Sequence, residues 1–153
     1  MSASLATVQA AIYARFGAAF VSGTPPTGGW NQAAYPVVAE NQAWATTGAK
    51  QPTDKAWGRL SIRVATSIDT SADARARRVT GVVWLQIFCP AETGSLPAMK
   101  MSDEMERIFG RQTVVLAGET LRFNRAVPGY VGIQADGWDQ FRCTVEFLSD
   151  AMT

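Results

Sequence analysis

Trp57-Gly-Arg-Leu-Ser-Ile-Arg-Val-Ala-Thr-Ser-Ile68 is the stretch of sequence that decides the fold. Apolar and polar side chains alternate along it. The apolar set comprises Leu60, Ile62, Val64 and Ile68, and the polar set comprises Arg59, Ser61, Arg63 and Ser67. A period of two residues is typical of a β-strand that is buried on one side. We therefore predict such a strand over residues 57–68.

A second strand is predicted over residues 77–89, after a polar segment at 69–76 that is too hydrophilic to be buried. The two strands should form a long antiparallel hairpin. Both faces of the second strand are apolar: one carries Val79, Val83, Leu85 and Ile87, and the other carries Val82, Trp84 and Phe88. Because such a strand has to be covered twice, we expect a helix on one face and a partner or second layer on the other.

An amphipathic helix follows the break Cys89-Pro-Ala-Glu-Thr-Gly-Ser95. Ser95 is its expected N-cap, Pro97 fits the first turn, and Gly110 marks the C-terminal stop. The spacing predicts a buried stripe made of Ala98, Met101, Met105, Ile108 and Phe109. The side facing solvent is expected to carry Asp103, Glu104, Glu106 and Arg107.

An earlier helix is predicted over residues 4–20, capped by Ser2 or Ser4. Its apolar residues recur at three- and four-residue steps: Leu5, Val8, Ile12, Phe16 and Phe20. This helix should pack on the sheet, because a membrane-surface helix would carry more charge than Arg15 alone.

The remaining strands are shorter or less regular. Residues 35–39 predict a short strand that Pro36 restricts to a first or edge position. A hairpin is expected from residues 112–116 and 120–124, and the segment 125–137 is a crossing loop or an irregular strand. The chain then alternates again over 138–148, with Phe141, Cys143, Val145 and Phe147 on the apolar side.

These elements predict an α+β fold in one domain over residues 1–153. The sheet should be mixed but mainly antiparallel, with two helices packed on one face. Matching alternation in three strands predicts a shared core made of Leu60, Ile62, Val64, Val83, Leu85, Ile87, Val145 and Phe147.

The amino-acid composition does not favour an enzyme. Charged residues make up only 18% of the chain, against about 25% in an average domain. The deficit indicates a surface covered by neighbouring subunits, or else a soluble monomer with uncharged polar loops. Histidine is absent, which removes the commonest general base and metal ligand. We therefore expect no enzyme activity, no cofactor and no small-molecule substrate.

No metal site is expected either. Cys89 and Cys143 are too few for a thiolate zinc site, and buried free thiols are favoured over a disulfide between strands. The pairs Asp69 with Asp73 and Asp136 with Asp139 sit in polar loops without a basic or apolar partner in the sequence. An acid–base or metal role for them is therefore not favoured.

The sequence offers no membrane segment and no nucleic-acid signature. No apolar run approaches the ~20 residues that span a bilayer, and the N-terminus has no basic region typical of a signal peptide. The net charge of +1 gives no global attraction to DNA or acidic lipid. We expect a protein made in a cytoplasm that does not bind nucleic acid sequence-specifically.

The candidate site is an interaction surface on the long hairpin. Arg75, Arg77 and Arg78 form the densest positive cluster, and Asp69 and Asp73 lie beside it. These side chains could contact an acidic neighbour or only solvent. Two long loops, at 21–35 and 43–56, carry Trp30 and Trp44, which could cover the core or anchor an interface. The core-lid interpretation is favoured for Trp57.

The ordered set of these elements resembles the tail terminator-like family of long-tailed bacteriophages and phage-derived particles. The resemblance rests on the helix at 8–20, the short Glu40-Asn41 element, Trp57-Gly-Arg-Leu-Ser-Ile-Arg-Val64 and Arg78-Val-Thr-Gly-Val-Val-Trp-Leu-Gln-Ile-Phe-Cys-Pro90 with its Thr93-Gly94 turn. It continues through the helix at 101–109, Gly118-Glu-Thr-Leu-Arg-Phe123 and Gly137-Trp-Asp-Gln-Phe-Arg-Cys-Thr-Val-Glu-Phe147. The loop at 43–56 is longer than the family pattern.

The resemblance implies a structural subunit of the virion tail, at its neck end. Such a subunit forms a homo-hexameric ring on the tail tube protein, stops tube polymerisation and offers the surface that meets a head-completion or neck protein. The alternatives are another phage neck, head-closure or tube-like subunit, or a monomeric ligand-binding domain.

Overall fold

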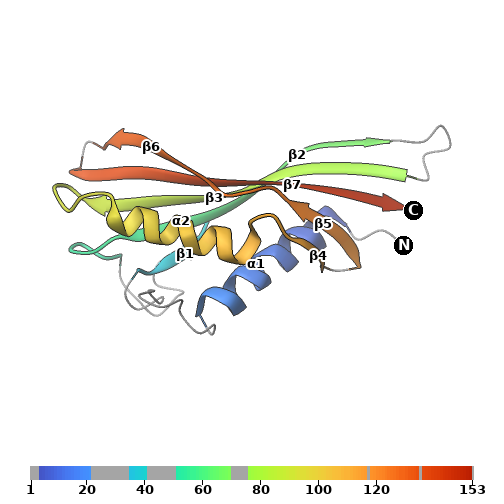
Figure 1. Cartoon of the computed structure of the whole chain (residues 1–153), viewed down its shortest axis with the longest axis horizontal. Coiled ribbons are helices and arrows are strands. Elements are labelled where there is room, and N and C mark those ends of the chain that lie inside the picture. The colour runs from blue at the N-terminus through green and yellow to red at the C-terminus, as the bar shows by residue number, and fades with distance from the viewer. Residues whose placement is uncertain are drawn as a thin grey trace.

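The computed structural model describes residues 4–21, 35–40, 51–69, 76–116, 118–134 and 136–152. Its centre is a seven-stranded mixed sheet, and both helices lie on one face of that sheet (Figure 1). The expected α+β fold is confirmed. The long loops at 21–35 and 43–56, the cap Ser2 and the side chains of Phe20, Ser67 and Ile68 fall wholly or largely outside this description.

The predicted hairpin forms the middle of the sheet. Strand β2 (Trp57–Asp69) pairs antiparallel with β3 (Ala76–Pro90), so that Ile62 lies opposite Val83. On its other side β3 pairs with β7 (Trp138–Met152), which places Val83 opposite Val145. The last strand is longer than the predicted 138–148, because its pairing with β3 continues to Met152.

Four short strands complete the sheet. Strand β1 (Val37–Ala39) is parallel to β2 and lies at the edge, as Pro36 required. Strands β4 (Thr113–Leu116) and β5 (Glu119–Phe123) form the second hairpin. The irregular segment is a strand as well: β6 (Val127–Ile133) pairs antiparallel with β7. The order is β1-β2-β3-β7-β5-β4, with β6 also on β7.

One edge of β7 is shared by two partners. Strand β5 pairs with residues 147–149 of β7, and β6 pairs with residues 139–144. The short link at 124–126 carries the chain from one partner to the other. The sheet therefore splits at this edge, and Figure 1 shows β5 and β6 diverging from β7.

The helices begin and end largely as the sequence predicts. Helix α1 (Leu5–Val21) is capped by Ser4, whose Oγ accepts a hydrogen bond from the Thr7 N–H at 3.1 Å. Helix α2 (Leu96–Phe109) follows Ser95, which occupies the N-cap position without a side-chain capping bond. Gly110 ends the helix, and its N–H donates to the Glu106 carbonyl.

The core lies between the helices and the face of the sheet that they cover. All five residues of the α2 stripe are buried, and Val8, Ile12 and Phe16 of α1 join them. Seven of the eight sheet residues expected to share this core do so: Leu60, Ile62, Val83, Leu85, Ile87, Val145 and Phe147.

Val64, the eighth, is exposed, so its assignment to the core is wrong. It lies at a β-bulge, where the register shifts between Val64 and Thr66. Its partner across the pair is Gly81, which has no side chain to cover it. Leu5 is also exposed, because it occupies the first position of α1.

Two residues assigned to solvent are buried instead. Ser61 lies directly opposite Trp84, whose indole is large enough to cover it. Glu104 is buried beside Arg107, which donates to its Oε2 at 2.7 Å. Arg107 also donates to the Ala19 carbonyl of α1, so this charged pair joins the two helices.

Candidate protein-interaction site

The face of the sheet opposite the helices carries a layer of aromatic side chains. Trp57 stacks on Phe88 with ring centroids 4.3 Å apart, and Trp138 meets Trp57 edge-on at 6.4 Å. Because Trp57 is only 4% exposed, it covers the sheet as the core-lid interpretation requires. These rings supply part of the second cover that the two-sided β3 strand needs.

Arginines lie over this aromatic layer. The Arg59 guanidinium is 5.7 Å from the Trp57 ring and 5.9 Å from the Phe88 ring. Arg142 lies 5.5 Å above Trp84 in the same manner. Such cation–π contacts keep the guanidinium near the sheet while its edge stays in water. At these two positions a guanidinium group lies over aromatic rings on the face of the sheet opposite the helices.

An ion pair lies at the β1 edge of the sheet. Arg63 donates to both carboxylate oxygens of Glu40, which joins β2 to the residue that follows β1. The hydrogen bond from Arg63 lowers the pKa of Glu40 below its ordinary value. The pair is solvent-exposed, so it orients the short edge strand more than it stabilises it.

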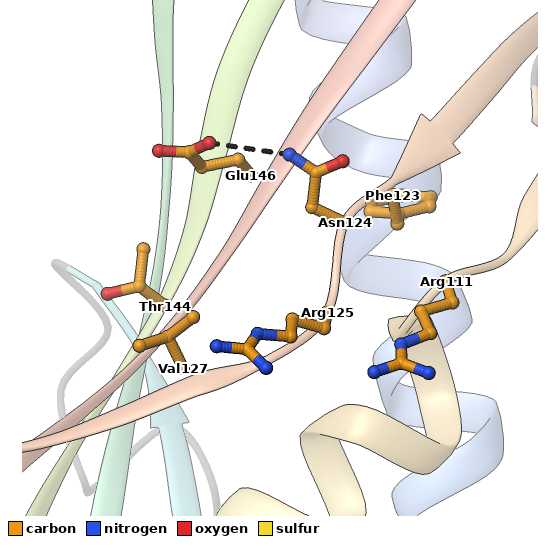
Figure 2. A pocket seen from close by; sticks show the side chains of 7 residues that line it. All are labelled: Arg111, Phe123, Asn124, Arg125, Val127, Thr144 and Glu146. Atoms are coloured by element: carbon orange, nitrogen blue, oxygen red, sulfur yellow. Dashed lines mark hydrogen bonds between the residues drawn. The ribbon is translucent and has the colours of Figure 1, made fainter.

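A cleft of about 660 Å³ opens where β7 changes partner from β5 to β6. Figure 2 shows Arg111 and Arg125 on one side of it, and Asn124 and Glu146 on the other. The Asn124 N–H donates to the Glu146 carbonyl at 2.9 Å, and its side-chain amide reaches the Glu146 carboxylate at 3.4 Å. Val127, Thr144 and Phe123 complete the lining.

Most of the side chains that line the cleft are polar or charged. The Arg111 guanidinium is 3.9 Å from the Glu106 carboxylate, a loose contact at an exposed position. Two guanidinium groups in an open cleft can receive a carboxylate.

The residues predicted for the interface are only partly described. The backbone of Asp69 pairs with that of Arg77 at the far end of the hairpin, and Arg78 follows as an exposed residue opposite Ile68. Asp73, Arg75, Trp30 and Trp44 lie outside the described residues. Three of the seven predicted residues are thus brought to one end of the hairpin, and their role stays a prediction.

Sequence reasoning left residues 125–137 as a crossing loop or an irregular strand, and it missed the exposed apolar surface of strand β6. Half of the large apolar side chains exposed among the described residues belong to this strand: Val127, Tyr130, Val131 and Ile133. The sequence does contain a sign of this apolar surface, because residues 126–135 include no charged residue. The glycines and Pro128 of this segment favoured a loop, because both residue types are typical of turns and loops.

Of the carboxylates considered for acid–base work, Asp73 lies outside the described residues, and Asp69 is described by its backbone alone. Asp136 is exposed in a turn, and Asp139 accepts a hydrogen bond from the Tyr130 hydroxyl at 3.3 Å. Within the described ranges, no three His, Cys, Asp or Glu side chains lie close enough together to hold a metal ion. No helix of the described chain is both long and apolar enough to cross a bilayer.

Cys89 and Cys143 are free thiols in the core, as expected. Burial raises the pKa of each to about 11, so at pH 8 each is almost entirely the unreactive thiol. We expect an aromatic disulfide reagent to label neither cysteine in the folded protein and both in denaturant. Rapid labelling of the folded protein at pH 8 would contradict this burial.

Comparison with known proteins supports the fold. One solved structure superposes with a TM-score of 0.62 over 97% of this chain and 96% of its own, and its 18% sequence identity supports a shared fold alone. No curated protein matches the sequence. The profile of the phage tail terminator protein family matches residues 7–147, which include all but the first two residues of α1, the whole of α2 and all but the end of the last strand. The chain therefore belongs to the phage tail terminator protein family.

Proposed function

We propose that this chain forms a hexameric ring that caps the tail tube. The ring stops tube polymerisation and presents the surface that a head-completion or neck protein joins. Family membership over residues 7–147 is the observation that carries this proposal. The low charge of the chain and the basic, aromatic sheet face support a protein that works through contacts with other proteins. Its place would be the neck end of the virion tail, assembled in the host cytoplasm.

Tail length tests the proposal directly. Tail tubes assembled without this protein should grow beyond their normal length and should fail to join heads. Adding the purified full-length chain should restore both, as seen by negative-stain electron microscopy. Tubes of normal length in its absence would assign the chain to another step of neck assembly.

The far end of the β2–β3 hairpin is the proposed contact with the tube or a neighbouring subunit. It is carried on two long paired strands, and its charged residues suit the rim of an interface. We expect the combined change of Arg75, Arg77 and Arg78 to Ala to leave the melting temperature nearly unchanged while reducing ring formation or tube capping. The difference from wild type should be largest at low salt, because high salt screens the same arginine contacts in the wild-type protein.

The triple variant is compared with Arg122→Ala, which removes an exposed arginine from β5 elsewhere on the sheet. Tubes capped equally well by the triple variant and by wild type would show that this end of the hairpin is not the contact.

A further inference from the structure

Strand β6 is an edge strand with an unusual surface. Among the described strands it pairs only with β7, so its other edge carries backbone N–H and C=O groups without a strand partner. Its exposed side chains are apolar, and Ile133 is 72% exposed. Native proteins guard such edges with charged residues, because an open apolar edge pairs with other chains. β6 has no charge.

Two features of β6 limit which strands can pair with it, but neither makes its edge more polar. Pro128 has no N–H to donate, and a bulge at Val131 shifts the register before Gly132. Both restrict which strand can fit beside β6. Neither adds polarity, so both are compatible with a specific partner that covers the edge.

A second copy of this chain offers a matching edge. Strand β2 is lined by β1 only over residues 58–60, and two α1 side chains reach its next carbonyls. Tyr13 donates to the Leu60 carbonyl and Gln9 to the Ile62 carbonyl, at 3.4 and 3.3 Å. Beyond them, residues 63–69 pair with β3 on one side only among the described strands. This stretch is as long as β6, whereas β1 has 3 residues and β4 has 4.

We infer that β6 of one subunit pairs with residues 63–69 of β2 in the next subunit. The two edges lie on opposite sides of the same sheet, so the contact is heterologous and each subunit offers one edge of each kind. Repeated around a closed ring, it joins the sheets of all subunits and leaves neither edge open. Val64, exposed at its bulge, supplies apolar surface toward Val131 and Ile133. The inference rests on the proposed ring and names the strands that form it.

Charge on the edge strand tests the contact. Val131→Lys with Ile133→Lys places two charges on exposed positions, so the monomer should keep its melting temperature within a few degrees. Ring formation by the full chain, measured by analytical ultracentrifugation alone and with purified tail tubes, should need at least a tenfold higher concentration. The matched control is Val115→Lys on the edge strand β4, because Val115 is 69% exposed and should tolerate the change with no effect on assembly.

Cysteine cross-linking identifies the partner strand. Val131→Cys is combined with a cysteine at Thr66, Ser67 or Ile68 in turn, and copper phenanthroline is added to the assembled protein. At least one pair should give a ladder of cross-linked species above the dimer, while each single variant should not. The native thiols are buried and should remain unlinked.

The outcomes separate this contact from the proposed function. Dimers from Val131→Cys alone would indicate β6 paired with β6, and cross-links to the tube protein would place β6 on the tube; either result overturns the inference. Normal rings from the double lysine variant would also overturn it, although the capping role would stand. A wild-type chain that neither forms rings with tubes nor limits tail length would contradict both the inferred contact and the proposed function.

Discussion

Val83→Asp is expected to lower the free energy of unfolding by about 3–5 kcal/mol. Val83 is fully buried at the centre of β3, with Ile62 opposite it on β2 and Val145 opposite it on β7. A carboxylate there loses its hydration and finds no partner, because the neighbouring core side chains are apolar. Chemical denaturation followed by circular dichroism measures the loss, and the variant should be largely insoluble at 37 °C.

The same chemical change on the surface provides the control. Val115→Asp puts a carboxylate on an exposed position of β4 and should alter stability by about 0.5 kcal/mol or less. A soluble Val83→Asp protein that melts like wild type would show that the buried face of β3 is assigned wrongly.

Gly81→Val should be the second severe change, at about 3 kcal/mol or more. A Cβ at Gly81 would lie 2.6 Å from the Arg63 carbonyl oxygen and would overlap the Phe147 ring. The carbonyl belongs to the paired strand β2, so it cannot move away without breaking the ladder between β2 and β3. We expect a large drop in melting temperature in a thermal scan.

Gly129→Val is the matched change in another strand glycine. Its nearest neighbour would be the Arg142 carbonyl at 3.8 Å, an ordinary contact. This variant should melt close to wild type. Equal losses in the two variants would mean that the effect comes from valine in a strand and not from the close approach at Gly81.

The core could be predicted because the spacing of apolar residues along a strand or a helix indicates which side of that element is buried. Leu85 and Ile87 recur at the strand period and Met101 and Met105 at the helical period, and all four are buried. Val64 obeys the same period and fails, because a bulge and an opposing glycine are properties of the pairing. Periodicity in one segment carries no information about what lies across from it.

The interaction surfaces were harder to predict for the same reason. The cleft joins Arg111, Asn124 and Glu146 from three segments that become neighbours only when β7 changes partner. Ser61 and Glu104 look like surface residues in sequence, yet both are buried. Ser61 lies opposite Trp84 in the strand pair, and Glu104 pairs with Arg107. Contacts between distant segments decide such positions, and no local pattern encodes them.

The last strand also has a consequence for biosynthesis. Ribosomes deliver a chain from its N-terminus, and β7 comes last among the described elements although it lies between β3 and β5 in the sheet. Strands β3, β5 and β6 precede their shared neighbour in the chain, so each of them leaves the ribosome before it does. The middle of the sheet can therefore close only after β7 has left the ribosome, and the nascent chain has no finished sheet until then.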